Sequence, residues 1–197
     1  MPVYDISQEV FSCRVYPGDP APEKRMLSRI EDGAVCNLSA FSMCAHNGTH
    51  IDAPLHFLSD GKAVDQIDLR ATVGLAYVWE HSGSILYEDA IRILETARAA
   101  DPQAAKRILI KGKATLTEEA AELFAASGIL LFGNESQTVG PEDSPMQVHL
   151  TLLSREVILL EGIVLEKVPE GVYLLCAAPL NLSGADGSPC RATLIKL

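Results

Sequence analysis

The sequence predicts a mixed α/β fold in which strands outnumber helices, and two observations carry this prediction. Residues 89–100 and 117–128 space their apolar side chains at helical intervals. Short apolar runs stand directly before and after the second of these segments, which is the pattern of a strand–helix–strand unit with parallel strands. The other apolar runs are short and bounded by turn residues, so they are typical of strands.

Both predicted helices have recognisable ends. The first, "DAIRILETARAA", starts with an acidic first turn at Asp89, and the second, "TEEAAELFAASG", runs from a threonine cap at Thr117 to a glycine stop at Gly128. The runs "RILIKG" and "GILLFG" that flank the second helix are the predicted parallel pair. Further strands are expected near residues 36–42, 46–52, 75–80, 157–161 and 173–177.

Length and cysteine usage set the broad class. A chain of 197 residues buries roughly 70% of the surface that its unfolded form exposes, so residues 1–197 are expected to form a single domain without disulfide or metal staples. No apolar run approaches the roughly 18 residues of a bilayer span, and the N-terminus lacks the pattern of a secretory signal. The five cysteines include no C-x-x-C pair, which favours reduced thiols and a cytoplasmic location.

The charge balance narrows the choice of partners. Sixteen basic and 26 acidic side chains give a formal net charge of −10. Such a chain repels nucleic-acid phosphates and anionic membrane surfaces at long range. The composition therefore favours a small-molecule substrate, with no nucleic acid and no membrane.

The stretch "HNGTHIDAPLHF", residues 46–57, holds three of the five histidines. A helix is disfavoured because Asn47 and Gly48 separate the first two histidines and a proline follows shortly after. On an extended strand, residues two apart share a face, so His46, His50 and Asp52 are expected to converge on one spot.

Two neutral imidazoles and a carboxylate suit Zn²⁺, Mn²⁺ or Fe²⁺, and the absence of a thiolate argues against a closed structural zinc site. An open catalytic metal site is therefore expected. The alternative is a polar turn of hydrogen-bonded histidines. Farther along, His149 and Glu161 stand in strongly apolar runs, and a buried carboxylate there requires a partner, either a metal site or a salt bridge to a basic residue.

The histidine stretch resembles the H-x-G-T-H-x-D-x-P-x-H motif of the cyclase family of metal-dependent hydrolases, which includes the bacterial kynurenine formamidases. Three further segments are similar to the family in the same order. They are "VYPGDP" (15–20), "HLTLLSREVILLEGI" (149–163) and "APLNLSGADGSPCRATL" (178–194).

The resemblance implies specific roles. His46, His50 and Asp52 would bind the metal, and His149 and Glu161 would complete the site, with one or two divalent ions, Zn²⁺ or Mn²⁺, per subunit. His56 would be the general acid/base. The family fold is a swivelling β/β/α domain with mixed sheets flanked by helices, usually assembled as a homodimer or homotetramer.

Some positions depart from the family pattern. Tyr16 stands where a tryptophan is common in the family, and we expect it to contact the substrate. Residues 110–117 and 133–145 also differ from formamidases, so N-formylkynurenine is not carried over as the substrate. His81 reads as a surface histidine, and the Asp186-Gly187 pair reads as a turn without a catalytic role.

The sequence thus leads to a hypothesis of metal-dependent hydrolysis of a small amide, formamide, lactam or lactone. The metal lowers the pKa of water to roughly 7 and polarises the carbonyl, and His56 protonates the leaving group. Two alternatives stay open: a cyclase that runs the reverse condensation, and a non-catalytic protein that binds a small molecule through its metal. The presence of His56 beyond the predicted ligands favours the enzyme.

Overall fold

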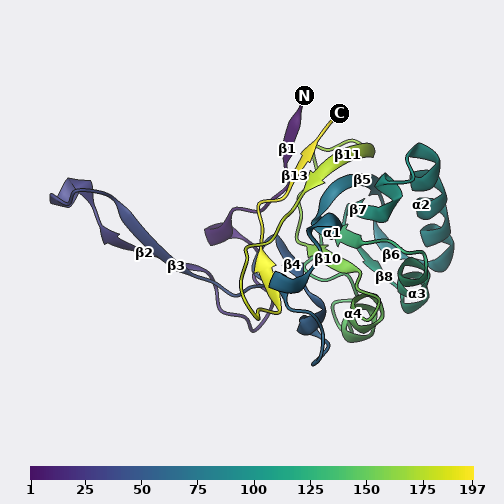
Figure 1. The fold of residues 1–197 in the computed structure, drawn as a ribbon, viewed down its shortest axis with the longest axis horizontal. Coiled ribbons are helices and arrows are strands. Elements are labelled where there is room, and N and C mark those ends of the chain that lie inside the picture. The colour runs from purple at the N-terminus through teal and green to yellow at the C-terminus, as the bar shows by residue number, and fades with distance from the viewer.

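The computed structural model describes residues 1–197 and is built around one large curled sheet (Figure 1). The sheet has nine strands in the order β1-β13-β11-β5-β7-β9-β10-β4-β12, and two further sheets, β2-β3 and β6-β8, have two strands each. The strands of the large sheet are β1 (Val3–Asp5), β4 (His50–Asp52), β5 (Val73–Glu80), β7 (Arg107–Lys111), β9 (Leu131–Asn134), β10 (Ile158–Glu161), β11 (Gly171–Cys176), β12 (Gly187–Pro189) and β13 (Thr193–Ile195). The small sheets comprise β2 (Glu23–Ser28), β3 (Leu38–Ser42), β6 (Gly83–Ile85) and β8 (Ala114–Leu116).

The centre of the large sheet is parallel and its flanks are antiparallel. Strands β5, β7, β9 and β10 run parallel to one another, whereas β11, β13 and β1 on one side and β4 and β12 on the other pair in antiparallel fashion. The predicted strand–helix–strand unit is confirmed, because β7 pairs with β9 in parallel and α3 lies between them in the chain. The mixed α/β class with strands in the majority is also confirmed.

Three of the four helices cover one face of the sheet (Figure 1). They are α2 (Tyr87–Ala100), α3 (Glu118–Ala126) and α4 (Met146–Leu153), and the short α1 (Leu69–Thr72) precedes β5. Strand β7 shows the alternation that this layering requires: Ile108 and Ile110 pack with the helices, whereas Leu109 packs in the apolar cluster on the opposite face. None of these helices combines the length and apolarity needed to cross a bilayer.

The helix ends follow the predicted chemistry. The side chain of Thr117 accepts a hydrogen bond from the amide of Ala120 at 3.3 Å and so caps α3. The helix stops before Gly128, whose φ of +73° suits a glycine. In α2, the carboxylate of Asp89 accepts a hydrogen bond from the amide of Leu86 at 3.0 Å, which explains the acidic first turn.

The structure corrects one predicted strand and adds two helices, the single turn α1 and the longer α4. The extended segment expected at 46–52 is only β4, His50–Asp52, and His46 lies in the turn before it. Asn47 produces that turn, since its side-chain oxygen accepts a hydrogen bond from the amide of Cys44 at 2.8 Å, and Gly48 leaves it at a φ of +65°. Helix α4, which carries His149, had no assignment from sequence because its eight residues form a mostly apolar run.

The hairpin of β2 and β3 projects away from the rest of the molecule (Figure 1). We call residues 23–42 the arm. The distal half of the arm exposes large apolar side chains. They are Leu27, Ile30, Val35 and Leu38, with exposed fractions of 49, 59, 101 and 51%.

Candidate active site

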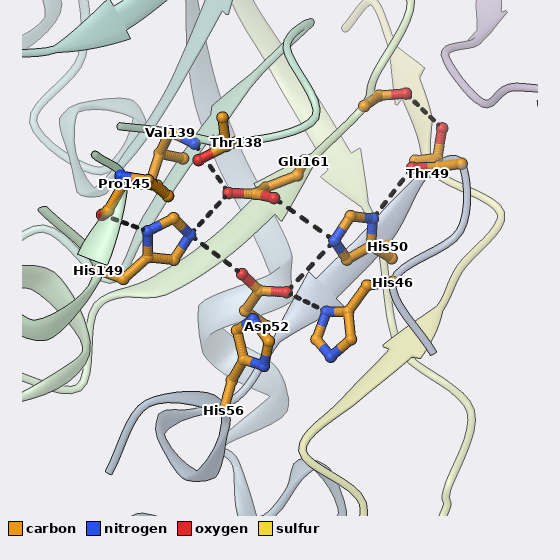
Figure 2. Close-up of polar contacts among 12 residues, drawn as sticks. His46, Thr49, His50, Asp52, His56, Thr138, Val139, Pro145, His149 and Glu161 are labelled. Atoms are coloured by element: carbon orange, nitrogen blue, oxygen red, sulfur yellow. Dashed lines mark hydrogen bonds and ion pairs between the residues drawn. The ribbon is translucent and has the colours of Figure 1, made fainter. Parts of the chain in front are cut away.

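The site is organised by β4, which lies between β10 and the edge strand β12. The register sets His50 opposite Glu161 on β10 and Asp52 opposite Gly187 on β12. Because side chains alternate, Ile51 enters the apolar cluster on the face away from the helices, and His50 and Asp52 point to the helix side. The first turns of α4 bring His149 to the same place (Figure 2).

Asp52 is at the centre of the cluster (Figure 2). Its Oδ1 lies 2.8 Å from Nδ1 of His46 and 3.3 Å from Nε2 of His50, and its Oδ2 lies 3.6 Å from Nε2 of His149. The side chain is 1% exposed, and Oδ2 is a buried oxygen without a hydrogen-bond partner. An orphaned buried carboxylate oxygen is costly, so this atom indicates that the cluster is built for a cation.

Glu161 faces Asp52 across the cluster. Its Oε1 lies 3.2 Å from Nε2 of His149 and accepts a hydrogen bond from the amide of Val139 at 2.8 Å, and its Oε2 lies 3.5 Å from Nε2 of His50. No lysine or arginine pairs with Glu161. The salt bridge to a basic residue, which the sequence left open, is therefore wrong, and the partners are histidines.

His50 and His149 each present one ring nitrogen to the cluster and hold the other outside it. Nδ1 of His50 lies 3.0 Å from the carbonyl oxygen of Gly48, and Nδ1 of His149 lies 2.8 Å from that of Pro145. A carbonyl accepts only, so each Nδ1 carries the proton as donor. The lone pair of a neutral ring then sits on Nε2, which is the nitrogen that faces the two carboxylates.

The electrostatics of the cluster follow from two buried carboxylates among histidines. Burial opposes the charged forms, but the contacts with Asp52 and Glu161 outweigh it and raise the pKa of His50 well above 6.5 and that of His149 to about 9. Burial likewise opposes the Asp52 carboxylate, and the hydrogen bonds from His46 and His50 hold its pKa well below the usual range. Without a metal, imidazolium groups supply the positive charge that these carboxylates require.

The ring of His46 reaches the cluster because it passes β12 at a glycine, Gly187. A Cβ on Gly187 would lie 2.5 Å from Cε1 of His46, closer than atoms can approach. The sequence predicted that His46 would share one face of a strand with His50 and Asp52. In the structure His46 joins them from the turn before β4 instead. The convergence of the three side chains was predicted, but the route taken by His46 was not.

His56 lies at the edge of the cluster, in the 3₁₀ helix Pro54–His56. Its ring stacks on the ring of His46, with centroids 3.9 Å apart and planes 26° apart, and 28% of the side chain is exposed. Burial lowers the pKa of His56 below 6.5, which keeps the imidazole neutral near pH 7. It is thus placed between the buried carboxylates and solvent.

Asp186 is the residue that sequence reasoning missed. Its Oδ2 lies 2.9 Å from Nε2 of His46 and 3.2 Å from Nδ1 of His56. The only signals in the sequence were an Asp-Gly turn and its place in a segment that resembles the cyclase family. Neither indicates that the turn, 130 residues beyond His56, touches two histidines.

Two other residues singled out from sequence lie outside this cluster. Tyr16 is half-buried in the loop before β2, where its carbonyl accepts a hydrogen bond from the amide of Asp19 at 3.0 Å, and its phenol makes no hydrogen bond to the cluster. His81 follows β5, and its Nε2 lies 3.3 Å from the carbonyl oxygen of Ser84.

The donor set fits a divalent metal. Three overlapping groups of three side chains each bring one ligand atom apiece within 4.8 Å of one another. They are His46, His50 and Asp52; Asp52, His149 and Glu161; and His46, His56 and Asp186. The first two share Asp52 and contain only imidazole and carboxylate donors, which suit Zn²⁺ and Mn²⁺.

Comparisons with known proteins identify the family. The model of the Cyclase family matches residues 4–141. The kynurenine formamidase of Paracidovorax citrulli (strain AAC00-1) is 32% identical over 209 residues, covering 98% of this chain and 95% of the relative. That of Bacillus anthracis is 35% identical over 205 residues, covering 96% of this chain and 95% of the relative.

Solved structures extend the agreement to the fold. A structure described as a potential metal-dependent hydrolase with cyclase activity superimposes with a TM-score of 0.81 at 29% identity, covering 98% of this chain and 96% of its own. Isatin hydrolase A from Labrenzia aggregata, bound to benzyl benzoate, has a TM-score of 0.83 at 21% identity, covering 100% and 94%, and shows likeness of fold alone. The resemblance inferred from the histidine motif is confirmed: the chain belongs to the cyclase family of metal-dependent hydrolases.

Proposed function

We propose that this protein hydrolyses the C–N bond of a small amide, formamide or cyclic amide with the help of a divalent metal at the Asp52 cluster. The observation that carries the proposal is the buried, unpartnered Oδ2 of Asp52 among histidine nitrogens. The proposed metal ligands are His46, His50, Asp52, His149 and Glu161, and the proposed general acid/base is His56.

The metal is proposed to be Zn²⁺ or Mn²⁺, with one or two ions per subunit. Two ions are supported by Asp52, which directs Oδ1 towards His46 and His50 and Oδ2 towards His149. A divalent metal supplies Lewis acidity there, which makes water nucleophilic at neutral pH and polarises a carbonyl.

The chain's own residues hold the ligand atoms and move the proton. The carbonyls of Gly48 and Pro145 fix the rings of His50 and His149, so their Nε2 atoms stay directed at the carboxylates. His56 is neutral near pH 7, so its imidazole can accept a proton from water and deliver it to the leaving nitrogen. Its position at the partly solvent-exposed edge of the cluster supports this role.

The substrate class rests on the relatives and on one aromatic side chain. The curated relatives named above are kynurenine formamidases, which supports an aryl formamide as the first probe. Phe57 stacks on His149, with ring centroids 4.6 Å apart and planes 27° apart, and meets His56 edge-on at 4.6 Å. It offers an apolar surface beside the proposed proton carrier on which an aryl ring can pack. Tyr16 is the proposed second substrate contact.

The test is a substrate panel on metal-loaded protein. Purified protein would be stripped with a chelator, reloaded with Zn²⁺ or Mn²⁺ and assayed against formanilides, cyclic imides, lactams and lactones. We expect turnover of at least one amide that chelation abolishes and metal restores. Loaded protein that binds a panel compound without turnover would instead identify a metal-dependent binding protein.

We also propose the setting in which the enzyme acts. Residues 1–197 form one domain that assembles as a homodimer or homotetramer, and the exposed apolar side chains of the arm support this assembly. A cytoplasmic location is supported by five cysteines that are all free thiols.

A further inference from the structure

Asp186 makes a contact that the proposed function does not use. One oxygen of its carboxylate, Oδ2, lies within hydrogen-bond distance of a ring nitrogen on each of two histidines, His46 and His56. A carboxylate oxygen has two lone pairs and can accept both N–H groups. The stacked arrangement of the two rings brings their nitrogens to the same side.

The backbone holds Asp186 in place. Its carbonyl accepts a hydrogen bond from the amide of Ala53 at 3.0 Å, and the carbonyl of Ala185 accepts one from Val64 at 2.8 Å. The next residue, Gly187, is paired with Asp52 in the sheet. The carboxylate therefore projects from a segment anchored on both sides to the strand and short helices that carry the histidines.

The contact with His56 selects one tautomer of that ring. A proton on Nδ1 is donated to Asp186, so Nε2 keeps the lone pair that proton transfer requires. Aspartate is ordinarily ionised near pH 7, so the group that accepts these protons is an anion.

The contact with His46 completes a pattern. His50 and His149 hold their outer nitrogens with backbone carbonyls, and His46 directs Nδ1 to Asp52 and Nε2 to Asp186. Each of the three histidines among the proposed ligands thus has an outer acceptor that fixes its ring. For His46 this acceptor is the same oxygen that holds the proposed proton carrier.

We propose that Asp186 is a positioning residue. Its Oδ2 orients both His46 as a metal ligand and His56 as the proton carrier. This inference rests on the proposed function of the same site. Outer acceptors of metal-bound histidines are worth roughly 10- to 100-fold in metal affinity or activity, which sets the expected size of the effect.

The experiment compares Asp186→Asn and Asp186→Ala with Asp65→Asn. Asp65 is a matched control because its Oδ1 accepts a hydrogen bond from the amide of Gly184 at 3.1 Å, in the same turn, without touching a histidine. Metal affinity would be measured by competition with a chelating dye. Values of kcat and KM would be measured at saturating metal on the best panel substrate. The imidazole tautomers would be read from nitrogen-15 NMR of histidine-labelled, metal-free protein.

We expect Asp186→Ala to lower kcat about 10- to 100-fold with KM little changed, to weaken metal binding by a similar factor, and to shift His56 away from the Nδ1–H tautomer. Asp186→Asn should fall in between, and Asp65→Asn should match wild type in all three. Unchanged tautomer and kcat in Asp186→Ala would overturn the inference, as would loss of a whole equivalent of metal, which would make Asp186 a ligand. The tautomer measurement needs no substrate, so it remains decisive if the panel finds no activity and the proposed function itself fails.

Discussion

His50 and His56, six residues apart, have environments that assign them different tasks. The His50 side chain is 2% exposed and lies between two carboxylates, whereas that of His56 is 28% exposed and contacts the half-exposed Asp186. A ligand requires the first environment and a proton carrier the second. The difference yields a prediction that separates metal binding from proton transfer.

Replacing His50 by Ala should remove metal and activity together, whereas His56→Asn should keep the metal and lose turnover. The loss for His56→Asn should be about 10²–10⁴-fold in kcat, the usual contribution of a positioned general acid/base. Elemental analysis and hydrolysis assays on the same protein samples would measure both. If His56→Asn loses its metal as completely as His50→Ala, His56 is a ligand and the division of roles is wrong.

Gly187 gives a second prediction at the scale of one residue. In Gly187→Ala the new methyl group would lie 2.5 Å from Cε1 of His46 and 2.9 Å from the carbonyl oxygen of Ile51, so the ring or the strand must shift, and we expect the hydrogen bond between His46 and Asp186 to weaken. We expect metal affinity to fall about tenfold or more, measured by chelator competition. Gly184→Ala is the control, because a Cβ there meets no atom within 4 Å and only strains a turn with a φ of +72°. Equal metal affinity in the two variants would show that ring clearance is not what Gly187 provides.

At the scale of elements, the sequence predicted what local periodicity can encode. Helices α2 and α3 and the parallel pair β7–β9 were expected from apolar spacing and caps. The convergence of His50 and Asp52 was also expected, because alternation along one strand is a local property. Helix α4 and the strand pairing of β4 were not, since a mostly apolar run of eight residues fits helix or strand and pairing partners come from distant segments. Asp186 was missed for the same reason.

The arm is the element whose purpose the single chain does not explain. A two-stranded hairpin is at best marginally stable alone in water, and the distal half of this one exposes four large apolar side chains. Residues 23–42 carry three basic and three acidic residues, so the arm is neutral although the chain has a formal charge of −10. The arm therefore adds no net charge that would repel a second copy of this acidic chain.

We accordingly predict that the arm carries the subunit contact. Wild-type protein should sediment as a dimer or tetramer at micromolar concentration, and the double substitution Ile30→Lys and Val35→Lys should shift it towards monomer, because charge at an apolar contact opposes association. Analytical ultracentrifugation would measure the species. Glu31→Gln, at the same tip, is the control and should stay assembled. A wild type that is already monomeric would contradict this prediction.

At the scale of the whole molecule, the cluster couples stability to both pH and metal. In the metal-free protein the pKa of His149 is about 9, against an ordinary value of 6.5, so its protonation favours the folded state. That contribution is complete below about pH 6.5 and is lost as the pH rises through about 9. A metal requires the neutral ring, so the stability it adds should grow over the same range.

The resulting prediction concerns melting temperature. Metal-free protein should lose thermal stability between pH 6.5 and 9, and the gain on adding Zn²⁺ or Mn²⁺ should increase with pH over that interval. Calorimetry of stripped and reloaded protein at matched ionic strength measures the two curves. A metal-induced gain that is flat or falls with rising pH would show that protonated histidines do not occupy the proposed metal site.

The place of β4 in the sheet has a consequence for how the protein is made. Its two neighbours are β10 and β12, which are synthesised more than a hundred residues later, so β4 leaves the ribosome with neither edge paired. Pairings between such distant segments are slow to form, because chain closure costs entropy before any contact forms. The proposed metal ligands therefore cannot assemble while the chain is still being translated through its middle. Capture of a metal by the full set of proposed ligands therefore has to wait until the segment that carries His149 and Glu161 has been synthesised.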